Sequence, residues 1–278
     1  MGKYSKLIKI AKIWEQKRVY DKAIAAYFDA MAIKPNNKIM WRHIGDLCHD
    51  ARMPDKAVEA FTHAVELDPT HMVTINSLSI ACTNNGQHEE ALEYNDRAIA
   101  LDHFNSNLWL NKGFIYSNMK NFPKALEAYE KSVEIDTKFL HGWDNIASTY
   151  MEMGDYDNAL NVAKDTVRID PYYSLGWNNL AYTYCQRKEY DQALEAINKA
   201  LELDKDSDIA MATLAEIYCG MEEYDKAIET CKKVINSYPS TALKICRECL
   251  SKDPDHNEAK RLLDQYAGRL RNILFSDE

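Results

Sequence analysis

Three asparagines recur at intervals of 34 residues, as Asn111, Asn145 and Asn179, while Asn76 and Asn178 stand one place earlier in the same period. A carboxamide has an acceptor oxygen and N–H donors, so a row of them can match the C=O and N–H groups of an extended peptide whatever its side chains. Helices pack about 8–10 Å apart, and a strand rises about 3.3 Å per residue. One asparagine per helix would then meet about every third peptide residue, so the pattern indicates backbone binding.

Charged and aromatic residues share the face predicted for these asparagines. Helical periodicity places positions 2, 5, 6, 9, 12 and 13 of each period on it. The lining changes from basic through polar and aromatic to acidic, which suggests an extended ligand with its acidic stretch near the N-terminal repeats and with apolar anchors. The residues are Lys9, Lys12, Arg42 and His43 at the basic end, the anchors Leu110, Phe114 and Tyr182, and Asp144, Glu152 and Glu216 at the acidic end.

No catalytic motif accompanies these residues. The sequence has no Gly-rich phosphate loop, no nucleophile elbow and no HExxH motif. Cys246 and Cys249 fall on one helix face with His256 nearby, which is the start of a zinc site, but a fourth ligand is not evident. We favour the interpretation that both cysteines are small core residues. We therefore expect no enzymatic activity, no cofactor and no metal.

The elements that position the asparagines follow from a repeat of 34 residues. Seven alanines share its register, and each follows a bulky apolar residue by sixteen positions. A methyl group lets two helices approach closely, and the bulky side chain fills the remaining space. The alanines are Ala23, Ala57, Ala91, Ala125, Ala159, Ala193 and Ala227, and the bulky residues are Leu7, Trp41, Ile75, Trp109, Trp143, Trp177 and Met211.

Each period holds two helical patterns separated by a polar turn such as Met153–Asp157, so we expect two antiparallel helices per repeat. Proline is expected to end the second helix at Pro35, Pro69, Pro171 and Pro239. The repeat ranges are 4–37, 38–71, 72–105, 106–139, 140–173, 174–207 and 208–241.

These positions resemble the tetratricopeptide repeat (TPR) family. Repeat two carries the family motif almost whole, as Trp41, Ile44, Gly45, Cys48, Ala57, Phe61, Ala64 and Pro69. Repeat three departs most, with Ser79, Cys82, Asn95 and His103 at motif positions. The resemblance implies an all-α, right-handed α-solenoid, with the first helices lining a concave groove.

The asparagines are similar to the ladder in the TPR superhelix of O-GlcNAc transferases, which holds substrates by their backbone. Nothing here resembles the glycosyltransferase domain, so that activity is not implied. The carboxylate clamp of chaperone-binding TPR proteins is absent, because Asp46 and Ser77 replace its asparagines, and Asn107 and Asn111 replace its cations.

After Pro239 the register fails. We expect residues 241–252 to form a shortened first helix and residues 257–274 a capping helix, with a partner-binding tail as the alternative. The apolar stripe of the cap comprises Ala259, Leu262, Leu263, Tyr266, Ala267, Leu270 and Leu274, and its polar face comprises Lys260, Arg261, Asp264, Arg269 and Arg271.

The bulk composition restricts the partners. The net charge is −9; residues 1–18 hold six basic residues and one acidic residue, a net +5, which leaves −14 for residues 19–278. An acidic body argues against nucleic acid or an anionic membrane as the partner. Seven cysteines at largely core positions, with no signal-peptide pattern, suggest a reduced cytoplasmic protein.

We predict that residues 1–278 form a single TPR superhelical domain that acts as a non-catalytic scaffold and binds an extended protein or peptide segment in its groove. The alternative is a structural or self-associating subunit, which makes a homo-oligomer the other expected state.

Overall fold

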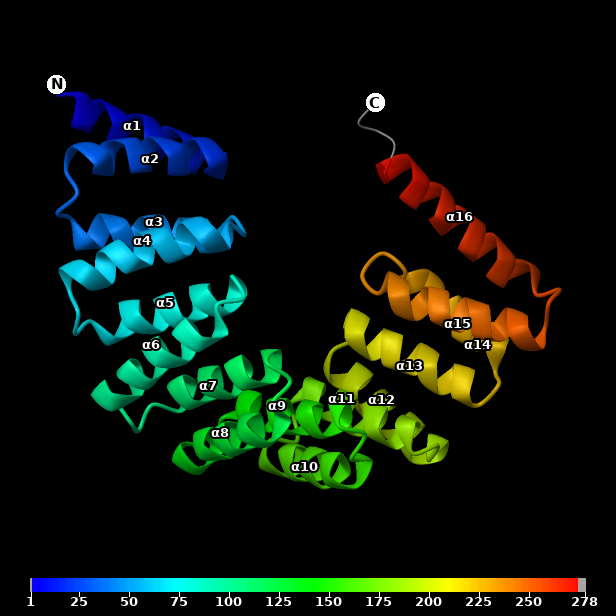
Figure 1. Ribbon diagram of the computed structural model, residues 1–278. Helices are drawn as coiled ribbons and strands as arrows, with labels where there is room; N and C mark the ends of the chain where they lie inside the picture. Colours follow the sequence, from blue (N-terminus) through cyan, green and yellow to red (C-terminus); the bar gives the residue numbers. More distant parts are fainter. Residues whose placement is uncertain (1, 275–278) are drawn as a thin grey trace. The chain divides into compact units, whose positions relative to one another are not determined.

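The computed structural model describes residues 2–274 of the 278-residue chain, with side chains as far as Tyr266. These residues form helices joined by short turns and contain no strand, so the prediction of an all-α solenoid is confirmed (Figure 1). The chain divides into two compact units, Met1–Gly142 and Trp143–Glu278. We describe each unit by itself, and a single superhelical domain of residues 1–278 stays a prediction.

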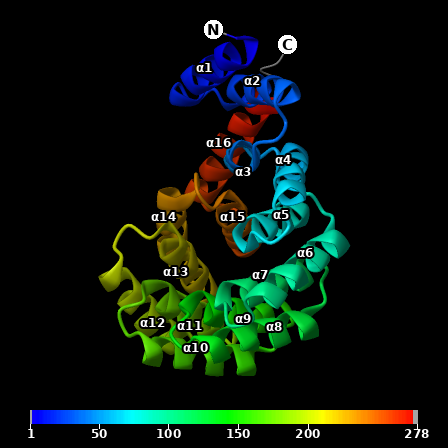
Figure 2. The same cartoon turned by 90° about the vertical axis from the view of Figure 1, so that its left-hand side faces the viewer.

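The N-terminal unit contains four helix pairs, one for each of the first four predicted repeats. In Figures 1 and 2 the partners of a pair, such as α7 and α8, lie side by side. Their bounds are α1 (Lys3–Gln16), α2 (Tyr20–Ile33), α3 (Lys38–Asp50), α4 (Pro54–Leu67), α5 (Met72–Asn84), α6 (His88–Leu101), α7 (Ser106–Asn118) and α8 (Phe122–Ile135).

The C-terminal unit continues the pairs. Helix α9 crosses the boundary between the units, so its first residues belong to the N-terminal one. The bounds are α9 (Leu140–Glu152), α10 (Tyr156–Ile169), α11 (Ser174–Gln186), α12 (Tyr190–Leu203), α13 (Asp208–Gly220), α14 (Tyr224–Val234), α15 (Pro239–Lys252) and α16 (Asn257–Leu274).

The turn inside each repeat has one backbone design. A residue with positive φ follows the first helix, and the next N–H donates to the carbonyl five residues before it, as from Met53 to Cys48 at 2.8 Å. This is the Schellman ending of a helix, which glycine favours. Only two of the seven positions hold glycine; the residues are Arg18, Arg52, Gly86, Lys120, Gly154, Lys188 and Glu222.

The seven repeated alanines are all buried, with at most 1% of their surface exposed, as the repeat pattern predicts. Two glycines also allow a helix backbone to approach an aromatic ring of the paired helix closely. A Cβ on Gly113 would lie 2.4 Å from the ring of Tyr129, and one on Gly45 would lie 2.6 Å from the ring of Phe61. Both rings are buried, so the glycines make room for them between the two helices of their repeats.

The repeated tryptophans also fix the linkers that precede their helices. The indole N–H of Trp41 donates to the carbonyl of Pro35 at 2.7 Å, and Trp177 bonds Pro171 in the same way at 2.9 Å. Trp109 donates to the carbonyl of His103 at 3.0 Å. Trp41 is buried, whereas Trp109 and Trp177 are half-buried, so the bond to the linker forms at either depth.

The C-terminal end differs from the prediction. Pro239 does not end the preceding helix. It lies in the first turn of α15, where a backbone N–H would have no intrahelical hydrogen-bond partner. Helix α14 ends earlier, at Val234, and has 11 residues where the second helices of repeats one to six have 14. Helix α15 has 14 residues and is therefore not shortened. Helix α16 spans the predicted cap, of which Ala267, Arg269, Leu270, Arg271 and Leu274 have side chains outside the described part.

Several successive first helices pack against one another: α5 packs against α7, and α13 packs against both α11 and α15. Among the second helices of the described residues, α14 packs against α16. Packing between first helices is typical of the inner face of a TPR array, so the surface that the first helices share is where we expect the groove.

Candidate peptide-binding groove

A pocket of about 810 Å³ lies between α1 and α3 on the face formed by the first helices of the N-terminal unit. Three residues of the predicted basic end, Lys12, Arg42 and His43, line it. Lys9 is exposed on α1 but does not belong to the lining. The apolar part of the wall includes Ile39, of which 66% is exposed.

Glu15 joins three helices inside this pocket. Its carboxylate accepts a hydrogen bond of 2.6 Å from the Tyr27 hydroxyl on α2 and lies 3.2 Å from Nε2 of His43 on α3. The rings of Tyr27 and His43 meet edge to face, with centroids 5.5 Å apart. Burial, and then the bond to Glu15, raise the pKa of Tyr27 far above its ordinary value. The tyrosine is thus a neutral donor that holds the carboxylate in place.

The charge of the pocket is mixed, whereas the sequence predicts a basic end. Three carboxylates, Glu15, Asp46 and Asp50, line it together with Lys12, Arg18, Arg42 and His43. Burial raises the pKa of Asp46, although Arg42 and His43 oppose this shift. Glu15, Asp46 and Asp50 hold positions 12, 9 and 13 of their repeats, so the periodicity that selects the basic residues places these acids on the same face.

The predicted asparagines of the N-terminal unit bond to each other. Asn111 on α7 donates from Nδ2 to Oδ1 of Asn76 on α5 at 2.8 Å, and both side chains are half-buried. This bond joins the first helices of consecutive repeats and fixes the orientation of both amides. A second N–H and the oxygen of Asn111 remain for a ligand, since an amide has two donors and two lone pairs.

A similar brace occurs in the C-terminal unit. Asn179 on α11 donates from Nδ2 to Oδ1 of Asp144 on α9 at 2.9 Å, and the Tyr173 hydroxyl donates to the other oxygen of the same carboxylate. Burial and then the bond to Asp144 raise the pKa of Tyr173. Asn145 lies half-buried on the next position of α9.

The sequence predicts Asn178 in the lining of the groove, but in the structure this side chain is buried. Only 4% of it is exposed, and its Oδ1 has no hydrogen-bond partner in the described part of the chain. One step along a helix turns a side chain by about 100°, so this asparagine is buried while Asn179 stays at the surface.

The predicted apolar anchors differ in exposure. Phe114 is 48% exposed, whereas Leu110 and Tyr182 are half-buried. Burial, and then the neighbouring Glu216, raise the pKa of Tyr182. Burial also raises the pKa of Glu216, although Lys244 on α15 opposes the shift. The acidic end therefore holds a half-buried carboxylate, that of Glu216, near the ring of Tyr182.

The region of Cys246 and Cys249 has the character of a core. Both thiols are fully buried, and burial raises the pKa of each. His256 accepts the Ala259 N–H at the start of α16, while its Nε2 lies 3.2 Å from Asp225. No group of three His, Cys, Asp or Glu side chains that could hold a metal occurs as far as side chains are described.

No helix within residues 2–274 combines the length and the apolar character that crossing a membrane requires.

Sequence profiles described as tetratricopeptide repeat match residues 40–71, 106–139, 140–173, 174–207 and 210–241. They match neither residues 4–37 nor the weakest predicted repeat, 72–105. A comparison with curated protein sequences gave no match.

Solved structures of TPR proteins are similar to this chain. MamA is 27% identical over 60% of this chain and 92% of its own, with a TM-score of 0.53. A tetratricopeptide repeat protein from Parabacteroides merdae is 16% identical over 89% of this chain and 98% of its own, with a TM-score of 0.69. Yeast Tom70 is 18% identical over 93% of this chain and 59% of its own, with a TM-score of 0.65. The last two show the fold alone.

The matched profiles cover five of the seven predicted repeats and agree with them in register, and the helix pairs, their turns and their packing agree with both. This chain belongs to the tetratricopeptide repeat family.

Proposed function

We propose that this TPR scaffold binds an extended protein or peptide segment on the concave face of its first helices and has no catalytic role. TPR proteins in general bind protein or peptide partners, and the family match extends that coarse function to this chain. The observation that carries the finer proposal is the amide brace between Asn76 and Asn111. It presents oriented donors and acceptors on the face of the first helices, which also carries the α1–α3 pocket.

The brace suits a peptide backbone because it removes the freedom of the amides before a ligand arrives. An amide that is already held loses little conformational entropy on binding. The mixed charge of the α1–α3 pocket then favours a ligand with both an acidic and a basic group over the purely acidic stretch suggested by the sequence. Phe114 supplies an exposed apolar contact on α7.

The partner is a protein and neither nucleic acid nor a membrane, in keeping with a net charge of −9. No cofactor and no metal are needed for this function. All seven cysteines are free and buried, which suits a reducing compartment such as the cytoplasm.

The test separates backbone recognition from side-chain recognition. Peptides are selected from a random displayed library on the intact protein, and their affinity is measured by fluorescence anisotropy. We expect alanine replacement of most peptide side chains to be tolerated, whereas N-methylation of alternate peptide amides should weaken binding at least tenfold. The double variant Asn76→Ala/Asn111→Ala should weaken the unmethylated peptides in the same way.

Asn161→Ala is the matched control, because Asn161 is an exposed asparagine on the second helix α10. Equal affinity of methylated and unmethylated peptides would contradict backbone recognition. Unchanged affinity in the double variant would move the binding site away from Asn76 and Asn111. Lys9→Glu and Arg42→Glu test the charge of the N-terminal end, since they should weaken acidic peptides in a salt-dependent way.

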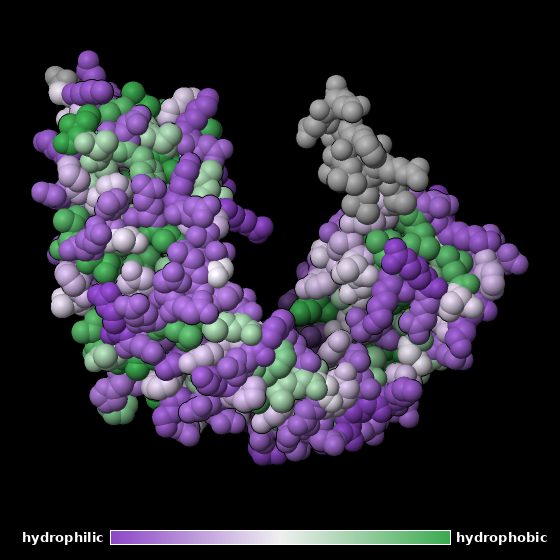
Figure 3. Space-filling view, in the orientation of Figure 1, coloured by the Kyte–Doolittle hydropathy of each residue, from purple (hydrophilic) through white to green (hydrophobic). Residues whose placement is uncertain are grey.

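Self-association is the second candidate. Apolar residues next to the linkers of the N-terminal unit are exposed, including Ile39 at 66%, Val73 at 54% and Phe104 at 73%. Figure 3 shows hydrophobic patches on this unit, separated by hydrophilic surface. Sedimentation velocity over a range of concentrations tests the idea: a mass that rises with concentration, and that falls to the monomer in Ile39→Lys/Phe104→Lys, would favour it over the peptide-binding function.

A further inference from the structure

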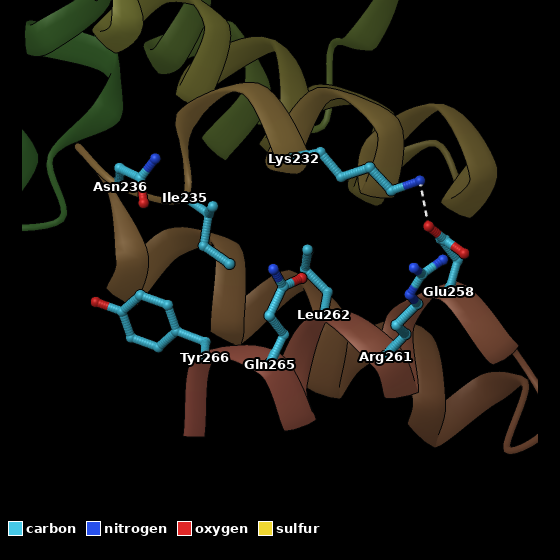
Figure 4. Close-up of a pocket in the computed structure, with 8 residues that line it drawn as sticks. All are labelled: Lys232, Ile235, Asn236, Glu258, Arg261, Leu262, Gln265 and Tyr266. Carbon is cyan, nitrogen blue, oxygen red and sulfur yellow. Dashed lines mark ion pairs between the residues drawn. The ribbon is translucent and has the colours of Figure 1, made fainter. Parts of the chain in front are cut away.

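The irregular end of the repeat array carries a pocket between its last helices. Because α14 stops at Val234, about one helical turn earlier than the second helices of repeats one to six, Ile235 and Asn236 lie in the turn before α15. A pocket of about 360 Å³ opens there between α14, this turn and α16 (Figure 4). It involves second helices and is therefore separate from the concave groove.

The floor of the pocket is apolar. Ile235 and Leu262 are each 8% exposed, and the ring of Tyr266 stands at one side of them (Figure 4). Pockets for small molecules have volumes of about 300–1,000 Å³. A volume at the lower end of this range accommodates one large side chain and part of its flanks.

The rim of the pocket is positive. Lys232 on α14 pairs with Glu258 on α16 at 2.5 Å, and this bond, with the nearby Arg261, lowers the pKa of Glu258. Arg261 is exposed beside Glu258, whose ion pair is with Lys232, so the guanidinium keeps N–H donors for a ligand. The rim thus holds two cations and one anion, on a protein whose net charge is −9.

We propose that this α14–α16 pocket binds a short segment of a partner protein in which a large apolar residue adjoins an aspartate or glutamate. The apolar side chain enters between Ile235 and Leu262, and the carboxylate pairs with the guanidinium of Arg261. Charge complementarity selects the acid, because a basic neighbour would meet Arg261 and Lys232, and the small volume selects a single side chain.

The experiment uses the full chain and defined probes. Fluorescein-labelled hexapeptides carry a central leucine flanked by two aspartates, two asparagines or two lysines, and a fourth peptide has serine between the aspartates. We expect the Leu–Asp peptide to bind at least about twofold more tightly than each of the other three, a ratio in keeping with one partly exposed charge pair.

Arg261→Glu should reverse the preference, so that the Leu–Lys peptide binds more tightly than the Leu–Asp peptide. Arg247→Glu is the matched control: it removes the same charge from an exposed arginine on α15 that does not line the pocket, and it should leave the preference unchanged. Gln265→Trp fills the pocket from an exposed position of α16 and should abolish binding while the circular dichroism of the protein stays unchanged.

A preference that persists in Arg261→Glu, or binding that survives Gln265→Trp, would overturn the proposal. Failure of all four peptides would overturn it as well. Dodecanoate is the final probe: if it binds to the wild type while the peptides do not, the pocket takes an anionic amphiphile and the partner assignment is wrong. None of these outcomes bears on Asn76 and Asn111, so the groove function stands or falls separately.

Discussion

Gly113→Ala tests whether the close packing inside a repeat depends on the missing side chain. The new Cβ would lie 2.4 Å from two ring carbons of Tyr129 and 2.9 Å from a third. Tyr129 is 1% exposed, so its ring has little space to withdraw. Overpacking of a core costs about 1–3 kcal/mol, whereas alanine gains about 1 kcal/mol over glycine in a helix. Because the contact involves rigid ring atoms, we expect the upper end of this cost and a net loss of about 2 kcal/mol in the free energy of unfolding.

The assay is urea unfolding followed by far-UV circular dichroism, with all variants analysed in the same way because repeat arrays need not unfold in two states. Repeat six offers the rescue: it holds Ala181 and Ile197 at the positions of Gly113 and Tyr129, both fully buried. In Gly113→Ala/Tyr129→Ile, the loss should be smaller than the sum of the two single losses by at least about 1 kcal/mol.

Gly154→Ala is the control for the backbone. It has φ of +75° and no atom within 4 Å of the added Cβ, so it should lose only about 1 kcal/mol through backbone strain. A Gly113→Ala protein as stable as the wild type, or more stable, would refute the reasoning, because helix propensity would then outweigh the clash. Additive losses in the double variant would refute the assignment of the clash to Tyr129.

Three further predictions follow from the fold. Lys188→Gly places glycine at φ of +62° in a Schellman turn, which should raise the unfolding free energy by about 0.5–1 kcal/mol, whereas Gly86→Ala at φ of +77° should lower it by a similar amount; thermal melts compare the two. Burial raises the pKa of Cys185 and Cys231 to about 12 from an ordinary value of 9.0. A thiol reagent should therefore leave both unmodified in the folded protein at neutral pH and modify them in urea. The stability that this pKa shift contributes is present below pH 9.0 and should be lost as the pH rises toward 12. Trp41→Phe removes the bond to the Pro35 carbonyl and should lower the unfolding free energy by about 1 kcal/mol, measured by urea unfolding, and an unchanged value would show that the linker is held by other contacts.

The helices of this protein follow from the spacing of its residues. A 34-residue period with alanine at a fixed place requires two helices per repeat that approach closely there, and the burial of Ala23 through Ala227 follows from that spacing. The weakness of repeat three was also visible, because Ser79 and Asn95 replace residues that pack. In the structure Asn95 is fully buried, and its Oδ1 finds no partner in the described part.

Periodicity also assigned the candidate groove residues to first helices, where they lie in the structure, but it could not decide what their side chains contact. Asn76 and Asn111 bond to each other across two repeats. Glu15 contacts Tyr27 and His43, so that three helices meet, and Asn178 is buried. Each of these contacts depends on the distance between neighbouring helices. A sequence pattern gives the direction in which a side chain leaves its own helix and carries no information about the gap to the next one.

The end of the array was decided by tertiary structure for a related reason. Proline is compatible both with the end of one helix and with the first turn of the next, because neither place requires a backbone N–H for an intrahelical hydrogen bond. Packing selects the second role for Pro239: α15 buries Ala242, Ile245, Cys246 and Cys249 in the same core as Ala227 and Cys231. That choice ends α14 early and opens the α14–α16 pocket, which local sequence preference leaves undetermined.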